Sequence, residues 1–139
     1  MPQLQEITEV SESGSFETLS PSPGKTIILN QYYQKFPVLT ATTNTTVLRT
    51  QTGAIFLAAN AAAEVDFTLP KAESGLEFTF INTVAQTLKV IPNSGDIIRI
   101  GADATNYQTN GTQWNSVTLI AISSTRWQSI SSVGSWTAS

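Results

Sequence analysis

The sequence contains no cysteine and no histidine among its 139 residues. Without cysteine there is no disulfide framework and no thiolate nucleophile, and cysteine usage says nothing about the redox compartment. Without histidine, the commonest general base of enzymes is missing. The sequence also has no phosphate-binding loop and no dinucleotide fingerprint. We therefore predict that the protein is not an enzyme, and we expect no cofactor and no metal.

Charged side chains are scarce as well, at 12% of the sequence with a net charge of −3, about half the usual share of roughly 25%. No stripe of basic residues is present that would hold phosphates, so nucleic acid is not an expected partner. No apolar stretch approaches the roughly 20 residues that span a bilayer, so we expect no membrane association. The N-terminal "MPQLQEITEV" has neither the basic start nor the apolar run of a signal peptide, and we expect a soluble product made in the cytoplasm.

Serine, threonine, asparagine and glutamine take the place of the missing charges. Threonine and serine suit exposed sheet faces and turns, whereas long solvated helices would need more lysine, glutamate, arginine and leucine. This composition favours an all-β fold.

Residues 1–24 differ from the rest, because they carry four glutamates and no lysine or arginine, and they end in the breaker cluster "SPSPG". One interpretation is a frayed tail. The other is an N-terminal acidic arm (residues 1–24) that lies on a neighbouring protein. A purely solvating tail would not need apolar anchors, and the arm has four of them: Ile7, Val10, Phe16 and Leu19.

Residues 25–139 are predicted to form one β domain, of which 53–139 is the best-defined module. "EVDFTLP" alternates Val65, Phe67 and Leu69 with polar residues, and "GLEFTFINT" alternates in the same way. This period of two is typical of half-buried strands, and Gly, Pro and Asn clusters separate the runs. Pro37 argues against a central strand nearby, so residues 25–59 are expected to contain loop and short edge strands.

The run "VTLIAI" at 117–122 breaks the simple alternation, because Ile120 and Ile122 are apolar on the side opposite Val117, Leu119 and Ala121. A strand that is apolar on both faces is covered on both faces. The cover of the second face is either the domain's own second layer, which is the default, or another copy of the chain.

Aromatic residues gather in the last third of the chain, including Tyr107, Trp114, Trp127 and Trp136. We expect Trp127 and Trp136 to pack on the core or at a subunit contact. The alternative is a row of exposed rings that binds sugar. Two acidic pairs, Glu64 with Asp66 and Asp96 with Asp103, are interpreted as solvent-facing or turn residues and not as a catalytic or calcium site.

The motifs "VDFTLP", "GLEFTFIN", "VIPNSGDIIRIG", "GTQWNSVTLIAIS" and "RWQSISSVGSW" occur in this order between Val65 and Trp136. In this order they resemble a β module of tailed-bacteriophage virion proteins, found in capsid decoration (cement) proteins, head fibres and tail appendages. The resemblance covers a little over half of the chain. It implies a β-sandwich or β-barrel unit that assembles as a trimer, and it brings no catalytic residue.

The predicted fold is therefore all-β, a single antiparallel β-sandwich or barrel domain with an extended N-terminal arm, assembling as a homotrimer. No rod of repeats or heptads is visible, which favours a decoration protein that binds the major capsid protein on the outer surface of the virion after synthesis in the host cytoplasm. Ile7, Val10, Phe16 and Leu19 are its predicted capsid contacts, and Ile120, Ile122, Trp127 and Trp136 its predicted trimer or core packing residues. The alternative is a fibre or tail appendage module that binds carbohydrate on the host surface.

Overall fold

The computed structural model describes residues 35–139, and Phe36–Ser139 forms one compact unit. Residues 1–24 and the four predicted capsid contacts Ile7, Val10, Phe16 and Leu19 lie outside the described residues. The described strands are β1 (Val38–Ala41), β2 (Thr45–Thr46), β3 (Ile55–Ala58), β4 (Val65–Thr68), β5 (Glu77–Asn82), β6 (Leu88–Ile91), β7 (Ile97–Ile100), β8 (Ala102–Ala104), β9 (Tyr107–Gln108), β10 (Ser116–Ala121), β11 (Arg126–Val133) and β12 (Thr137–Ala138). A 3-10 turn, η1 (Arg49–Gln51), is the helical element of this part of the chain.

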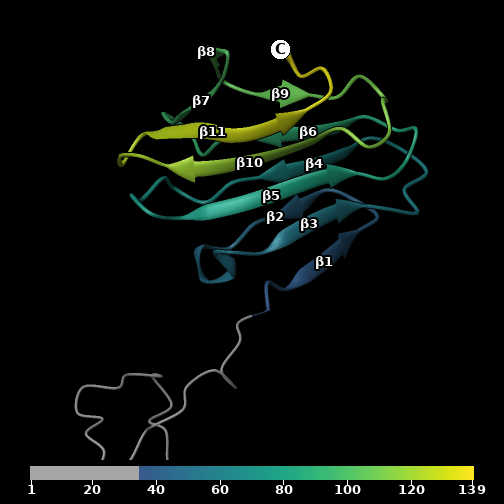
Figure 1. Ribbon diagram of the computed structural model, residues 1–139, viewed down its shortest axis with the longest axis horizontal. Coiled ribbons are helices and arrows are strands. Elements are labelled where there is room, and N and C mark those ends of the chain that lie inside the picture. The colour runs from purple at the N-terminus through teal and green to yellow at the C-terminus, as the bar shows by residue number, and fades with distance from the viewer. Residues whose placement is uncertain (1–34) are drawn as a thin grey trace, which may run out of the picture. The chain divides into compact units, whose positions relative to one another are not determined.

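The strands form two sheets packed face to face, which confirms the all-β sandwich (Figure 1). The seven-stranded sheet has the order β1-β3-β5-β10-β11-β7-β8, and the five-stranded sheet has the order β12-β9-β6-β4-β2. From β1 to β6 the chain alternates between the sheets, so each strand returns to its own sheet through a strand of the other.

The sheets are mixed, and the expectation of purely antiparallel pairing is corrected in this respect. β1, β3 and β5 are parallel to one another, as are β2, β4 and β6. A parallel pair needs a crossover connection, and here the strand in the opposite sheet supplies it. The hairpin of β10 and β11 then inserts between β5 and β7, with β10 antiparallel to β5 and β11 parallel to β7.

The alternating residues of the sequence form the core between the sheets. Val65, Phe67 and Leu69 from β4 and its end face Phe78 and Phe80 from β5, and all five are fully buried. Aromatic rings pack directly on one another across this space, with centroids 5.1 Å apart for Phe67 and Phe80 and 5.7 Å apart for Phe78 and Trp127. Aromatic burial of this kind supplies much of the stabilisation of a small domain.

A buried asparagine holds the loops at one end of the sandwich. The side-chain amide of Asn82, at the end of β5, donates to the carbonyl oxygens of Gln86 and Thr112 at 2.9 and 3.0 Å, and to Oγ1 of Thr109 at 3.1 Å. The same Thr109 oxygen accepts the backbone N–H of Leu88 at 3.0 Å. One side chain therefore satisfies polar groups of the β5–β6 and β9–β10 loops. These groups belong to no strand, so a side chain has to supply their hydrogen bonds.

The end of the chain is tied into the domain. Nε1 of Trp136 donates to the carbonyl oxygens of Ser116 and Val133, and β12 pairs with β9 at the edge of the five-stranded sheet. Gly134, with φ of 79°, precedes this turn, and a Cβ there would lie 1.9 Å from Oδ1 of Asn115. Only glycine fits this position, and Asn115 itself fixes the next residue by donating to the Ser135 carbonyl at 2.7 Å.

Candidate interaction surface

The outer face is the side of the seven-stranded sheet that points away from the five-stranded sheet. Registered partners in neighbouring strands point to the same side, so the pairing places three rows of side chains across this face. The apolar row is Thr40, Leu57, Ile81, Ser116 and Val133. The threonine row is Val38, Ile55, Thr79, Thr118 and Ser131. The charged row is Glu77, Ile120, Gln128, Arg99 and Asp103.

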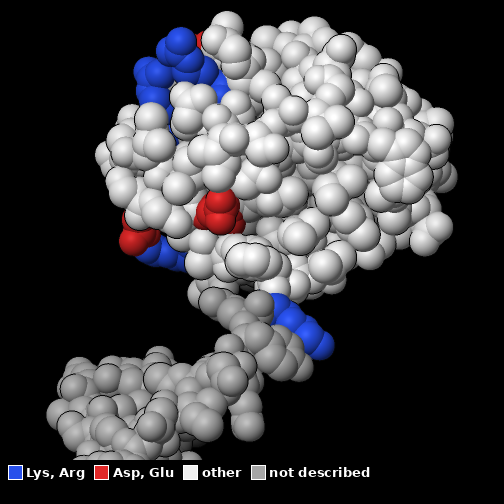
Figure 2. Space-filling model, viewed as in Figure 1, with Lys and Arg blue, Asp and Glu red and all other residues white. Residues whose placement is uncertain are grey.

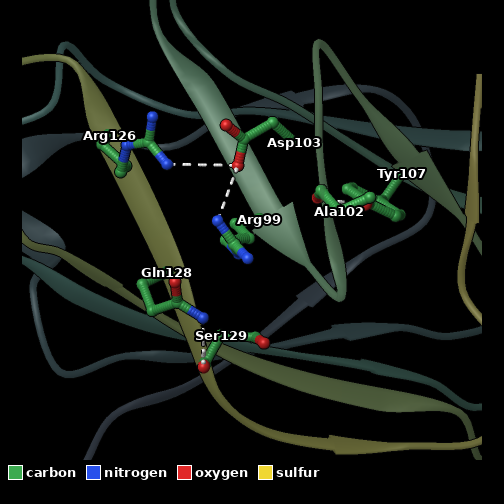
Figure 3. A network of polar contacts seen from close by, with 7 residues as sticks. All are labelled: Arg99, Ala102, Asp103, Tyr107, Arg126, Gln128 and Ser129. Atoms are coloured by element: carbon green, nitrogen blue, oxygen red, sulfur yellow. Dashed lines mark hydrogen bonds and ion pairs between the residues drawn. The ribbon is translucent and has the colours of Figure 1, made fainter.

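Charge is confined to one end of the outer face. Figure 2 looks onto this face, and its acidic and basic atoms gather toward the left and at the lower rim, leaving the centre and right free of them. At one corner the carboxylate of Asp103 lies between two guanidinium groups, 3.1 Å from Arg126 and 3.7 Å from Arg99 (Figure 3). These ion pairs are exposed and contribute little to stability, about 0–1 kcal/mol each.

β11 carries two exposed apolar side chains, of which Val133 lies in the apolar row of this face. Ile130 and Val133 are 57% and 58% exposed, respectively. Thr118 pairs with Ser131 and Leu119 with Ser129, so Ile130 is the extra residue of a β-bulge. β7 pairs with β11 only from Arg126 to Gln128. Ser129–Val133 therefore lacks a strand partner on that side among the described residues, and residues 130–133 are exposed.

The structure places the four predicted packing residues in two different environments. Trp127 is fully buried against Phe78 inside the sandwich, and Trp136 packs against the edge of the same core. Both rings belong to the core packing of this chain, so Trp127 is not available as a subunit contact. Ile120 and Ile122 instead point to the outer side, where Ile122 is 52% exposed.

The default expectation that the domain's own second layer covers both faces of β10 is corrected for the described residues. Val117, Leu119 and Ala121 are buried against the five-stranded sheet, which is the one layer that packs on β10 in this part of the chain. A two-layer sandwich covers one face of each strand. The other face, with Ile120, remains on the outside.

The aromatic residues do not line up as a sugar platform. Tyr107 and Trp127 are buried, and Trp136 is partly buried. Trp114 is the exception: it is 67% exposed and has φ of 68°, which is uncommon for a residue with a side chain. Of these four aromatic residues only Trp114 stands fully on the surface, where the alternative hypothesis needs a row of them.

Asp66 and Asp96, one from each acidic pair, have partners elsewhere in the fold. The backbone N–H of Asp66 donates a hydrogen bond to Oδ1 of Asn44, and the carboxylate of Asp66 accepts one from Nδ2 of Asn44. Asp96 is buried, forms an ion pair with Lys71 and accepts the backbone N–H of Ala72 at 2.8 Å. Its role is to join the β4–β5 loop to the β6–β7 turn. No group of three or more acidic side chains that would hold a metal ion occurs within residues 35–139.

A pocket of about 320 Å³ opens on the outer face, next to the charged end. Its walls come from the chain before β1, the start of β3, the start of β5 and the middle of β10. The lining residues are Phe36, Gly53, Ala54, Ile55, Glu77, Phe78, Thr79 and Thr118. No pattern in the sequence indicates this pocket, because its residues come from four separate segments.

Comparison with family models and with curated proteins finds no match to this chain. Within residues 35–139 there is no helix long and apolar enough to cross a membrane.

Proposed function

We propose that the protein is a structural binding module that works through the outer face of its seven-stranded sheet, and more specifically a capsid decoration protein. The observation that carries the proposal is the uncharged apolar and threonine rows of this face, which end on β11 in Val133 and Ser131, beside the exposed bulge residue Ile130. Seven strands make a face about 30 Å across, and these strands, of three to eight residues, run for about 10–26 Å. This size is comparable to one side of a standard protein interface, roughly 800 Å² per partner.

The sequence resemblance to phage virion modules supports the choice of partner. In this proposal copies join into a homotrimer through the β11 part of the outer face, where Ile130 and Val133 are exposed, and the acidic arm (residues 1–24) of each copy binds the major capsid protein through its apolar residues. Residues 35–139 hold equal numbers of acidic and basic side chains, so the net charge of −3 belongs to the segment before them. Three linked arms would bind a symmetric shell much more tightly than one arm. The protein would then act mechanically, by bridging neighbouring capsid subunits on the virion surface.

Placing lysine at both exposed positions of β11 is expected to prevent self-association without unfolding the domain. The full chain should sediment as a trimer at micromolar concentration, and the Ile130→Lys, Val133→Lys double variant as a monomer of 15.0 kDa. Both side chains are more than half exposed, so their replacement changes the free energy of unfolding by only about 0.5 kcal/mol each. Two charges per copy at the interface, however, would repel one another and require desolvation.

The matched control is Leu48→Lys, which adds a charge at another exposed apolar residue, 54% exposed, that belongs to none of the three rows. It should remain a trimer. A wild-type chain that sediments as a clean monomer contradicts self-association through this face.

Removal of residues 1–19 is expected to leave the β domain folded and to abolish attachment to the shell. The measurement is co-sedimentation with bare capsids assembled from the major capsid protein of the same virus, with thermal melting of the truncated chain as the control for folding. If the truncated chain saturates capsids with the affinity of the full chain, residues 1–19 do not make the contact.

The second candidate function, a fibre or tail appendage module that binds host carbohydrate, is favoured by one observation, the exposed ring of Trp114 on a left-handed backbone. Strained and exposed residues of this kind are found at binding sites. The location of the protein in the purified virion separates the two functions. Copies spread over the whole shell support decoration, and copies confined to the tail or to a single vertex support the appendage.

A further inference from the structure

The pocket on the outer face combines an aromatic wall with a carboxylate. Phe36 is 59% exposed and forms one wall, Ile55 contributes an aliphatic surface, and Glu77 stands at the end that carries the charged row. Oγ1 atoms of Thr79 and Thr118 lie 2.9 Å apart in a hydrogen bond across the two strands that line the pocket. The volume of about 320 Å³ equals roughly ten waters at their share of the liquid, enough for one long side chain.

The carboxylate of Glu77 has no hydrogen bond or ion pair with any residue of the described part of the chain, although its backbone is held firmly. Its N–H donates to Oγ1 of Thr52 at 3.0 Å, and its carbonyl accepts the N–H of Gly53 at 2.7 Å. Of the other described acidic residues, only Glu64 is similarly without an ion pair or hydrogen bond, and it is exposed to solvent. Glu73, Asp96 and Asp103 each have a basic partner. Glu77 is therefore a half-buried anion on a hydrogen-bonded backbone, without a counter-charge among residues 35–139.

Gly53 allows the aromatic wall to form. It has φ of 87°, and a Cβ added to it would already lie 3.5 Å from Cδ1 of Phe36. A side chain longer than methyl at this position would push the ring away, and the backbone conformation favours glycine in any case. The close approach of Phe36 to the β3 and β5 backbones is thus specified by the sequence.

We propose that this pocket binds the side chain of an arginine or lysine presented by the capsid protein that the module contacts. An aromatic face attracts a cation, and a nearby carboxylate adds direct charge complementarity. The aliphatic stem of arginine or lysine would lie on Ile55, and the threonine hydroxyls would accept hydrogen bonds from its head group. Arginine is a frequent anchor of protein interfaces. The identity of the partner rests on the proposed function; the preference of the pocket for a cation does not.

The preference is tested on the full chain with N-acetyl-arginine amide as the probe and the uncharged N-acetyl-citrulline amide as its matched analogue. In two-dimensional NMR titrations the arginine derivative should shift the backbone amides of Gly53, Glu77 and Thr79 in a saturable manner at millimolar concentration. The citrulline derivative should bind about fivefold more weakly, since it lacks the charge. Glu77→Gln and Phe36→Ala should each weaken binding of the arginine derivative by a similar factor, whereas Glu64→Gln, which removes the other carboxylate without a partner among residues 35–139, should leave the binding unchanged.

Equal shifts with arginine and citrulline derivatives, or unchanged binding to the Glu77→Gln chain, would overturn the cation preference. Saturable shifts of the same amides by galactose or N-acetylglucosamine, without an effect of the arginine derivative, would overturn it in favour of a saccharide.

Capsid co-sedimentation distinguishes the cation preference of the pocket from the identity of the partner that supplies the cation. If Glu77→Gln keeps its trimeric mass but binds capsids more weakly, the capsid protein supplies the cation. If Glu77→Gln instead weakens the trimer, a second copy supplies it, and the choice of occupant is wrong.

Discussion

Truncation of Trp127 to alanine is expected to be the most damaging single change in the β domain. The ring is fully buried, packs 5.7 Å from Phe78 and lies where β11 joins the centre of the seven-stranded sheet. Removing a buried tryptophan typically costs about 3–5 kcal/mol, while the total free energy of unfolding of a domain is only about 5–15 kcal/mol. Thermal melting followed by circular dichroism should show a midpoint lowered by more than about 10 °C.

The matched control is Trp114→Ala, which removes the same side chain from a position that is 67% exposed. Its free energy of unfolding should stay within about 0.5 kcal/mol of wild type. Trp127→Phe should fall between the two, because it retains most of the ring and also removes Nε1, which is buried and has no hydrogen-bond partner among the described residues. A Trp127→Ala protein that melts like wild type but no longer binds host cells would contradict core packing and favour the carbohydrate-binding module.

The residues of each strand that face the core could be predicted from the sequence. The period of two in "EVDFTLP" and "GLEFTFINT" identified Val65, Phe67 and Phe78 as core residues, and all three are fully buried. Such a pattern is reliable because a strand side chain has only two directions, and apolar residues collect on the side that faces the other sheet. The edge position of β1, directly after Pro37, follows from the missing N–H of proline.

The pairing of the strands could not be predicted in the same way. The alternation of β3, β5 and β4 is identical for parallel and antiparallel neighbours, since it reports burial and not direction. Consecutive strands from β1 to β6 lie in alternating sheets, so the partner of each strand is not its neighbour in sequence. Which strands pair therefore depends on long-range packing. The bulge at Ile130 could not be predicted from the sequence either. It arises because Thr118 pairs with Ser131 and the next residue, Leu119, pairs with Ser129, which leaves Ile130 unpaired.

The candidate surface was anticipated in part. The two-faced run "VTLIAI" indicated that Ile120 and Ile122 need a cover on the side opposite Val117, but the default expectation assigned that cover to the domain's own second layer, whereas both residues lie on the outer side of the sheet. Ile130 and Val133 carried no such signal, because serines flank them and the run "SISSV" has no apolar alternation. The pocket needed Phe36, Gly53 and Glu77 to be brought together from segments that are far apart in the chain, which only the folded structure does.

Replacing Asn82 by aspartate is expected to have the second largest effect on stability. The buried amide donates to three oxygen atoms, those of Gln86, Thr109 and Thr112, between 2.9 and 3.1 Å. Aspartate has nearly the same shape but offers an acceptor where the donor is needed. Burying a charge among acceptors, and leaving two carbonyls unpaired, should lower the free energy of unfolding by about 3 kcal/mol or more, as measured by urea denaturation.

The series that tests this places Asn82→Ala beside Asn82→Asp and uses Asn110→Asp as the control. Asn82→Ala loses the same hydrogen bonds without adding a charge, so its loss should be smaller than that of Asn82→Asp. Asn110 is exposed and has φ of 51°, a conformation that aspartate also tolerates, so the same chemical change there should be nearly neutral. If Asn82→Asp unfolds at the same urea concentration as Asn110→Asp, the loops at this end of the sandwich do not depend on the buried amide. If it unfolds at a far lower urea concentration, the buried amide of Asn82 holds both loops in place. These loops connect the two sheets at the right of Figure 1.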